Sequence, residues 1–490
     1  MKTLRMVFSI VLFVLCALPF QLWAQNKEIP ITTSSKEALD YFLQGRDKLE
    51  NFENTAAAQL FDQAIAADSN FAMAYLYRSL AGGGLEVRMS NLEEAVARAK
   101  DVSEAEQNYI SMVQAAYVGN SLKQNECLNK LLTDFPFDKR VRLEAGNYYY
   151  NNKDYPNALA QFAKSAELDA LFAPAYNMIG YANSKLSNYD EAANAFRNYI
   201  KLNPKSPGGY DSYAELLLTM GMYDNSIAQY NKALEYDPDF SYSLIGLGNN
   251  YVFLGDYDTA RKYYQQYYDN APTPGARYDA LNLEAVSYVH EGKIEKALSV
   301  YHQYGDLAQK ENDAYHQVMG LASQGMIYAE CGNPQEAMKH YDEAIELLWK
   351  SDINQAAKEN LMNSSKLWHL YALGANGEFK KAETDEKVCL QNAKMRNNPQ
   401  EMAFLNSVCG YLDYKKGDIN EALKHFSKAD PEDPITQYYN ALCFQNKGDV
   451  QNANRLFQKI SLSNVNSLDL ALVRNRAFNR QMNNMSYSVK

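Results

Sequence analysis

The residue types that most often carry out chemistry show no catalytic spacing in this chain. Six histidines lie in the C-terminal half, but none pairs at i, i+4 with another ligand in a recognisable zinc pattern, and no HExxH motif occurs. The GxxxxGK[ST] and GxSxG motifs are also absent, and Gly82-Gly83-Gly84 lacks the lysine and hydroxyl residue of a phosphate loop. The sequence therefore predicts no catalytic residue, no metal site and no cofactor. An enzyme would need a site assembled from scattered positions.

The cysteines do not indicate a disulfide framework. Residues 25–490 contain five, an odd number, and none has CxxC spacing. Cys409 and Cys443 lie on first helices of neighbouring predicted units and could approach each other. We expect each cysteine to be a small buried thiol.

Residues 139–274 consist of four segments of 34 residues that follow one another without an insertion. Each segment has a small residue at its eighth and twentieth places and an aromatic residue at its seventeenth and twenty-fourth. The small residues are Gly146, Gly180, Ala214 and Gly248, then Ala158, Ala192, Ser226 and Ala260. The aromatic residues are Tyr155, Tyr189, Tyr223 and Tyr257, then Phe162, Phe196, Tyr230 and Tyr264. A repeat of this length indicates a solenoid.

Each segment is predicted to form two helices. Tyr176, Ile179, Gly180 and Asn183 follow the i, i+3, i+4, i+7 spacing of an amphipathic helix, and a second such set follows the turn at 187–188. A small residue at a helix crossing lets the two backbones approach, and the aromatic residues fill the space beside it. Proline at the thirty-second place cannot continue a helix and ends the pair. Because one pair cannot bury its apolar face alone, the units must stack into one elongated body.

These positions resemble the tetratricopeptide repeat family. In the segment from Ser241, Gly248, Ala260 and Tyr264 stand where the family pattern has Gly, Ala and Phe, and Pro272 closes the unit. The resemblance implies an all-α fold, an α-solenoid in the form of a right-handed superhelix, built from tandem helix-turn-helix repeats.

The resemblance also implies a concave groove, which the family lines with places 2, 5, 9, 12 and 13 of its first helices. Carried onto this chain, the candidate partner-binding residues are Arg140, Asn147, Tyr150, Asn177, Tyr181, Lys185, Asp211, Glu215, Tyr242, Asn249 and Phe253. Asparagine offers donors and acceptors to an extended backbone, and tyrosine combines apolar area with a polar tip. The lysines of a chaperone-type carboxylate clamp are missing, because place 5 holds Leu143, Asn177, Asp211 and Ile245.

The periodicity divides the chain into five parts. They are a signal peptide (1–24), N-terminal divergent repeats (25–138), four regular repeats (139–274), repeats with longer helices (275–350), and C-terminal divergent repeats with a capping helix (351–490). Ser34 with Glu37 has the spacing of a capping box for the first helix. The three glycines 82–84 predict a turn or hinge.

The first 24 residues have the layout of a secretory signal peptide. Lys2 and Arg5 precede an apolar run over residues 6–18, and Leu22-Trp23-Ala24 indicates cleavage after Ala24. No other apolar run approaches the length of a membrane span. We therefore expect secretion across the inner membrane of a Gram-negative bacterium, to the periplasm or to an outer-membrane-associated complex, with no membrane span after cleavage.

The net charge of −11 becomes −13 without residues 1–24, because these contain two basic residues and no acidic one. Such a charge repels nucleic acid and anionic membranes. We therefore predict a scaffold that binds a protein or peptide partner through its concave surface, and no enzyme. The alternative is a ligand-sensing repeat protein that closes on a small peptide or saccharide, because the longer units from Tyr278 resemble those of helical sensors.

Overall fold

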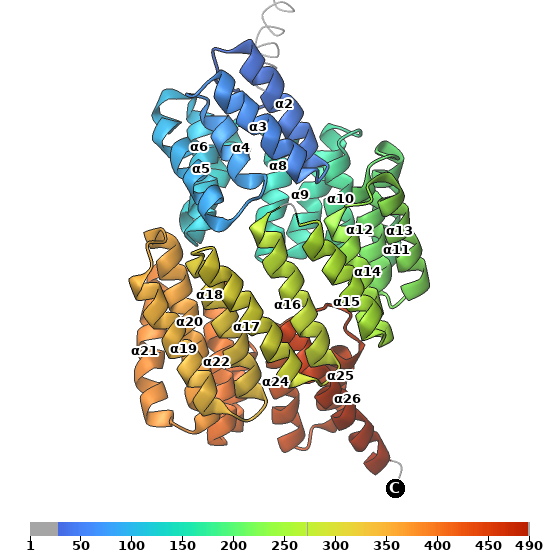
Figure 1. Cartoon of the computed structure of the whole chain (residues 1–490), viewed down its shortest axis with the longest axis vertical. Coiled ribbons are helices and arrows are strands. Elements are labelled where there is room, and N and C mark those ends of the chain that lie inside the picture. The colour runs from blue at the N-terminus through green and yellow to red at the C-terminus, as the bar shows by residue number, and fades with distance from the viewer. Residues whose placement is uncertain (1–27, 272, 489–490) are drawn as a thin grey trace, which may run out of the picture.

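The computed structural model describes residues 28–271 and 273–488. Over these residues it contains 25 α-helices, one short 3-10 helix and no β-strand. Consecutive helices pack as pairs, and the pairs stack side by side (Figure 1). The predicted all-α solenoid is therefore confirmed, whereas the predicted signal peptide, 1–24, lies outside the described residues.

Three helix pairs form the N-terminal part. They are α2 (Lys36–Glu50) with α3 (Asn54–Ala67), α4 (Ala72–Leu80) with α5 (Leu85–Arg98), and α6 (Glu104–Tyr117) with α7 (Ser121–Asp134); the 3-10 helix Ala99–Asp101 follows α5. The N-cap of α2 is Ser35, whose hydroxyl accepts the Ala38 N–H at 3.1 Å, so the predicted cap at Ser34 was wrong by one residue. Gly82 and Gly83 have φ values of 93° and 105° and form the predicted turn between α4 and α5.

The four regular repeats follow. Their helices are α8 (Lys139–Asn151) with α9 (Tyr155–Leu168), α10 (Ala173–Lys185) with α11 (Tyr189–Leu202), α12 (Pro207–Thr219) with α13 (Tyr223–Tyr236), and α14 (Ser241–Leu254) with α15 (Tyr257–Asp269). A Cβ atom on Gly146 would lie 2.2 Å from the Phe162 ring, and one on Gly248 would lie 2.2 Å from the Tyr264 ring. The ring thus occupies the space that a side chain at the eighth place would need, which confirms the predicted role of the small residues.

Longer helices begin at residue 274 and continue past residue 350. They are α16 (Pro274–His290), α17 (Ile294–Lys310), α18 (Ala314–Glu330), α19 (Pro334–Lys350), α20 (Gln355–Asn376), α21 (Phe379–Arg396) and α22 (Pro399–Lys416). The chain ends in shorter helices followed by one long one: α23 (Ile419–Phe426), α24 (Pro434–Asn446), α25 (Val450–Leu462) and α26 (Leu468–Ser488). Helix α23 has only 8 residues, whereas the second helices of the regular repeats have 13 or 14.

The solenoid winds back on itself, so that its two ends contact its middle. Helix α26 packs against α16 and α18 as well as against α24 and α25 (Figure 1). In the α2–α3 turn, Asn51 accepts a hydrogen bond from Asn203 at 2.6 Å. In α22, Gln400 donates to the Asn151 carbonyl at 2.8 Å. These contacts between successive turns close the array, whereas stacking alone predicts an elongated body.

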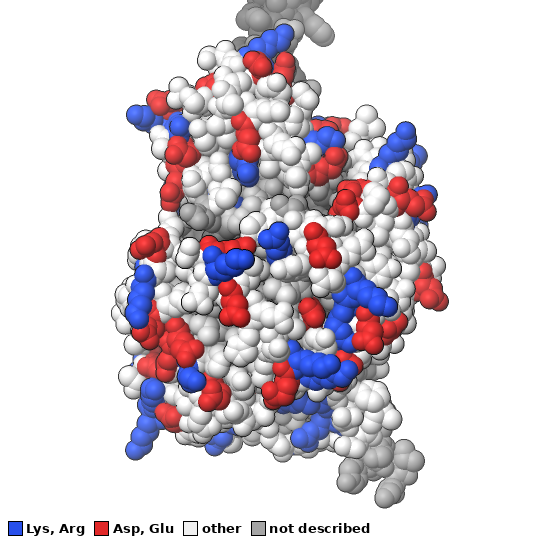
Figure 2. Space-filling view, in the orientation of Figure 1, with Lys and Arg blue, Asp and Glu red and all other residues white. Residues whose placement is uncertain are grey.

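The outer surface carries charges of both signs. Figure 2 shows basic and acidic side chains interspersed over this face, with no large area of one sign. Within residues 28–271 and 273–488, no helix combines the length and the apolar character needed to cross a membrane. The five cysteines of this region are free, and four of them are buried; the buried-thiol prediction is wrong for Cys331, which is exposed.

Candidate functional site

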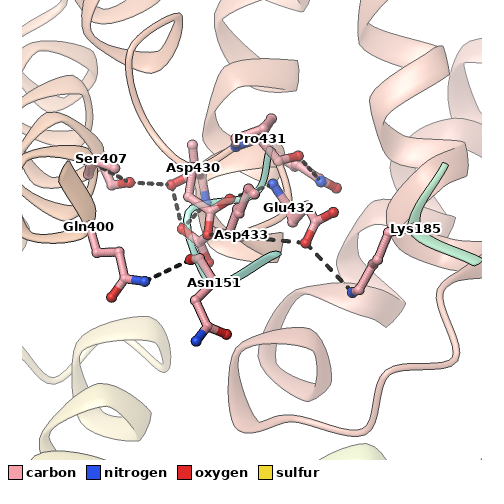
Figure 3. Close-up of polar contacts among 12 residues, drawn as sticks. Asn151, Lys185, Gln400, Ser407, Asp430, Pro431, Glu432 and Asp433 are labelled. Atoms are coloured by element: carbon pink, nitrogen blue, oxygen red, sulfur yellow. Dashed lines mark hydrogen bonds and ion pairs between the residues drawn. The ribbon is translucent and has the colours of Figure 1, made fainter. Parts of the chain in front are cut away.

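A pocket of about 670 Å³ lies where the C-terminal helices meet the first regular repeat. Its wall comes from the α8–α9 turn and from α18, α20, α22, α24 and α26. The loop between α23 and α24 forms its rim, and Figure 3 shows the polar contacts of this loop. The lining residues include Lys153, Trp368, Tyr371, Phe404, Tyr411, Asp430, Glu432, Asp433, Tyr439 and Asp469.

The early end of α23 creates this rim. Phe426 is the last residue of α23, and its ring fills the space beside Gly410 as in the regular repeats. The unit containing Gly410 has its proline, Pro431, at place 29 instead of 32. Proline disfavours helical geometry for the residue before it and cannot join the helix itself. Residues 427–433 are therefore free to form an acidic loop over the pocket.

Two lysines neutralise the acidic rim. Lys153 forms an ion pair with Asp430, and its Nζ lies 3.7 Å from a Glu432 carboxylate oxygen. The Lys185 Nζ lies 3.7 Å from the same Glu432 oxygen (Figure 3). The Tyr155 hydroxyl also donates to Glu432, at 3.2 Å. These contacts hold the loop against α9, α10 and the α8–α9 turn.

The floor of the pocket holds two further carboxylates. Asp433 is the N-cap of α24 and accepts the backbone N–H groups of Ile435 and Thr436 at 3.3 and 3.0 Å. Asp469 lies in the first turn of α26. Burial raises the pKa of Asp433 above its usual range. Burial and the nearby charges of Asp433 and Glu330 raise the pKa of Asp469 to about 7.

An aromatic wall stands beside these carboxylates. Tyr371 and Tyr411 stack with ring centroids 3.9 Å apart, and Tyr439 meets Tyr411 edge-on at 4.7 Å. The hydroxyls of Tyr371 and Tyr439 donate to Glu330, which also pairs with Arg476 at 2.5 Å. The Glu330 side chain is 1% exposed, so this network satisfies a buried charge and fixes the wall.

The chemistry of the pocket is that of recognition. Its volume lies in the range of about 300–1,000 Å³ that is typical of ligand sites, and a mainly apolar lining with a few polar groups is typical of them too. The described part of the chain contains no cluster of three or more His, Cys, Asp or Glu side chains that could hold a metal ion.

Three of the predicted groove residues lie next to the pocket rim. Lys185 contacts Glu432 there. The Tyr150 ring packs edge-on against Tyr155 at 5.3 Å, and burial and the charges of Glu215 and Glu432 raise the pKa of Tyr150. The structure therefore brings Tyr150, Lys185 and Glu215 together with the acidic loop.

Four other predicted groove residues contact distant parts of the same chain. Arg140 pairs with Glu50 at 2.6 Å, and Tyr242 accepts a hydrogen bond from Asn54 at 3.1 Å, so the N-terminal pair covers both. At the other end, Asn249 accepts a hydrogen bond from Asn466 at 2.8 Å. The guanidinium of Arg474 lies 4.7 Å from the Phe253 ring centroid. These side chains bind the solenoid to itself.

The remaining four predicted groove residues are Tyr181, Asp211, Asn177 and Asn147, of which Tyr181 and Asp211 bond to other residues of the regular repeats. The Tyr181 hydroxyl donates to Glu215 at 2.8 Å, and Asp211 accepts from Ser243 at 2.8 Å. Burial raises the pKa of Asp211 to about 8. Asn177 is 1% exposed, and Asn147 on α8 is half-buried. These residues form the part of the predicted groove between its two covered ends.

Sequence reasoning missed the pocket itself. The signal was the run Asp430-Pro431-Glu432-Asp433-Pro434, in which two prolines and three acids interrupt a repeat unit. Prolines at that spacing predict an early helix end, and three acids on such a loop predict a charged rim. The opposite wall could not be found in this way, because it comes from residues about 250 positions away.

The fold and the pocket together define a class: a helical-repeat solenoid with a pocket between distant parts of the array. Family models described as tetratricopeptide repeat match residues 173–206, 213–276, 245–312 and 321–347. The matched segments are therefore tetratricopeptide repeats.

The chain is similar to repeat proteins of distant organisms. It is 21% identical over 277 residues to the anaphase-promoting complex subunit 3 of Schizosaccharomyces pombe. This match covers 55% of this chain and 39% of the relative. It is 22% identical over 288 residues to the TPR repeat-containing protein MJ1428 of Methanocaldococcus jannaschii, and this match covers 58% of this chain and 41% of the relative. The chain thus spans about two fifths of the length of these relatives. The solved structure of TTC0263, a thermophilic TPR protein in Thermus thermophilus, is 20% identical, with 37% of this chain and 96% of that one covered and a TM-score of 0.32.

Proposed function

We propose that this protein is an interaction scaffold that holds an extended segment of a partner protein on its inner surface, with one side chain in the pocket. The observation that carries the proposal is the pocket of about 670 Å³, walled by aromatic rings and rimmed by an ordered loop. A preformed cavity of this kind lowers the entropic cost of binding. The proposal assigns binding, and no reaction, to the chain.

The inner surface beyond the pocket supports the same function. Tyr181, Asp211 and Glu215 extend from the rim into the regular repeats, where they offer hydroxyl and carboxylate groups to a bound backbone. The S. pombe relative is by name a subunit of a larger complex, which is consistent with a scaffold role here.

We further propose that the protein works outside the cytoplasm. The layout of residues 1–24 supports export across the inner membrane of a Gram-negative bacterium. The partner would then be a periplasmic protein or a component of an outer-membrane-associated complex. Fusion of residues 1–30 to a reporter that is active only after export tests this placement, and loss of reporter activity on Leu15→Arg is the expected control.

A substitution that fills the pocket tests the scaffold. Ala403 lies on α22 and lines the pocket, so Ala403→Trp should obstruct it without removing a core side chain. Ala160, exposed on α9, provides the matched control Ala160→Trp. A library of displayed 12-residue peptides would be selected on residues 25–490.

The selected peptides should bind the wild type and Ala160→Trp equally and bind Ala403→Trp at least tenfold more weakly. A library that yields no peptide sensitive to Ala403→Trp would contradict the proposal. Circular dichroism and thermal unfolding of both variants show whether the fold is preserved.

A second function, ligand sensing by closure, is favoured by one observation. The pocket wall joins the α8–α9 turn to α22 and the acidic loop, about 250 residues away along the chain. A small peptide or saccharide bound there would tie two turns of the solenoid together. A decrease in the radius of gyration on addition of such compounds, measured by small-angle scattering, would favour the sensor over the scaffold.

A further inference from the structure

The carboxylates of the pocket are unequally neutralised. At the rim, Asp430 and Glu432 face two basic residues, Lys153 and Lys185. At the floor, Asp433 and Asp469 form no ion pair with any Lys, Arg or His in residues 28–271 and 273–488. Arg476, on the same helix as Asp469, pairs with Glu330 instead. The floor therefore lacks a positive charge that the rim has.

This shortage has an electrostatic consequence. The charged groups that act on Asp469 are Asp433, from the loop before α24, and Glu330, from α18, and both are carboxylates. Burial makes ionisation of Asp469 costly and the two carboxylates add to that cost, so that its pKa is raised to about 7. A cation brought by a ligand would remove this cost, and the gain would appear as binding free energy.

A buried hydroxyl behind the pocket wall lacks a hydrogen-bond partner. Tyr341, on α19, is 0% exposed, and its hydroxyl makes no hydrogen bond within the described structure. Its ring stacks on Trp368, which lines the pocket, with centroids 6.4 Å apart. The charges of Glu330 and Asp469 both act on it, which locates the hydroxyl near the same carboxylates. Buried polar groups are normally paired, so this one indicates a place completed by something else.

The aromatic wall completes a recognisable combination. Flat rings beside carboxylates that have no ion-pair partner favour a flat cation, because a guanidinium stacks on aromatic faces and donates two parallel hydrogen bonds to a carboxylate. A lysine ammonium has the charge but lacks both the planar face and the bidentate geometry.

We propose that the pocket recognises an arginine side chain of the partner, with Asp469 and Asp433 as the groups that bind its guanidinium and Tyr371, Tyr411 and Trp368 as the surrounding aromatic surface. This inference rests on the proposed scaffold function and specifies its partner: a protein segment with an arginine at its anchoring position. Beyond the rim, α12 of the regular repeats carries Asp211 and Glu215, and these acidic residues favour further basic residues along the same partner segment.

The test removes the charge from each side of the contact in turn: the arginine of the peptide and the carboxylate of the pocket. Peptides selected on residues 25–490 would be synthesised with arginine and with citrulline, which has nearly the same shape and no charge. Their affinities would be measured by calorimetry for the wild type, for Asp469→Asn and for Asp433→Asn. Asparagine keeps the N-cap function at position 433. Asp258→Asn, at an exposed carboxylate of α15, is the matched control.

We expect citrulline to weaken binding to the wild type and to Asp258→Asn by at least tenfold. Asp469→Asn should weaken binding of the arginine peptide to a similar degree, and citrulline should then have little further effect, as expected of two groups in direct contact. Selected peptides that lack a basic residue, or a citrulline effect of undiminished size in both floor variants, would overturn the arginine pocket and leave the scaffold intact. The absence of any peptide sensitive to Ala403→Trp would overturn both.

A probe that needs no selected sequence gives an independent result. Nα-acetyl-arginine methylamide should raise the thermal unfolding temperature of the wild type and not that of Asp469→Asn, whereas the citrulline analogue should raise neither. Equal stabilisation of both proteins by the arginine compound would place its binding elsewhere and overturn the inference.

Discussion

The regular repeats (139–274) and the C-terminal repeats (351–490) use the same helix pair but differ in how closely they keep the repeat pattern. In the regular repeats, each first helix begins at the first residue of a 34-residue segment. The last of these helices, α14, contacts the N-terminal pair through Tyr242 and the segment before α26 through Asn249. In the C-terminal repeats, α23 ends early and an acidic loop follows. The small and aromatic packing residues thus build the solenoid, whereas the early end of α23 adds the acidic rim of the pocket.

The same residue type therefore has two different roles. Phe162, at the twenty-fourth place of a regular repeat, is 0% exposed and fills the space beside Gly146. Phe404, on α22, is half-buried and lines the pocket. An aromatic ring at the twenty-fourth place supports packing, whereas a ring at the second place of the unit containing Gly410 is available to a ligand.

The largest expected effect is a difference in the free energy of unfolding between variants that lack the Phe162 ring and the Phe404 ring. Phe162→Ala should lower the free energy of unfolding by about 3–5 kcal/mol, because it removes a fully buried ring and leaves a cavity. Phe404→Ala should cost about 1 kcal/mol, because its ring is already partly exposed. Urea denaturation followed by circular dichroism measures both, and hydrogen exchange in α8 and α9 localises the first loss. Equal losses would mean that the pocket aromatics are as structural as those of the repeats.

The next largest effect concerns the attachment of α26. Arg476→Ala leaves Glu330 buried without its cation and should cost about 3 kcal/mol, since an unpaired buried charge is strongly destabilising. Hydrogen exchange should show lower protection of the α26 amides. Arg480→Ala, at an exposed position of the same helix, should change little. Adding Glu330→Gln to Arg476→Ala should restore most of the loss; failure to do so would show that Arg476 acts through packing.

The sequence predicted the solenoid well because local physics determines it. The helices of the regular repeats begin at the predicted first residues and at the seventeenth-place tyrosines, where the spacing of small and aromatic residues leaves few alternatives. The cap of α2 was misplaced by one residue because Ser34 and Ser35 are both good N-caps, and only the structure shows which hydroxyl reaches a free N–H.

The pocket could not be predicted because it depends on how far the solenoid winds. Helix α26 is the predicted capping helix, but it also packs on α16 and α18, where Leu470, Val473 and Ala477 are each 0% exposed. A small change in the rotation between units accumulates over many repeats, so sequence periodicity does not determine which distant turns meet. The contact of Gln400 with Asn151 is a product of that accumulated rotation.

A smaller effect should appear in the pH dependence of stability. The pKa of Asp469 in the folded protein, about 7, lies above its ordinary value of 3.8, so the folded protein binds this proton more tightly than the unfolded chain. The stability that this proton contributes is fully present below pH 4 and is lost as pH rises through 7. Asp469→Asn cannot ionise and should therefore match the wild type near pH 4.

At pH 8 the Asp469→Asn variant should exceed the wild type in free energy of unfolding by at least about 1 kcal/mol, since one pKa unit corresponds to about 1.4 kcal/mol. Thermal unfolding between pH 4 and pH 8 measures the difference. Asp258, whose pKa is lowered by Arg261, should show no such gain when changed to Asn. A difference between the two proteins that stays constant with pH would show that the pKa of Asp469 is not raised in the folded protein.

The smallest effect lies where the two regions meet. Lys153, on the α8–α9 turn of the regular repeats, pairs with Asp430 of the C-terminal loop, and the two side chains are 38% and 29% exposed. Lys153→Ala should therefore cost less than about 1 kcal/mol of stability. Removing a competing cation from the rim should strengthen binding of an arginine peptide about threefold at low salt, and added salt should reduce this gain by screening. Lys164→Ala on α9, which also removes one charge, is the control and should leave the affinity unchanged. A loss of affinity in Lys153→Ala would instead mean that the rim lysine positions the acidic loop, so that the regular repeats contribute to the shape of the pocket as well as to its charge.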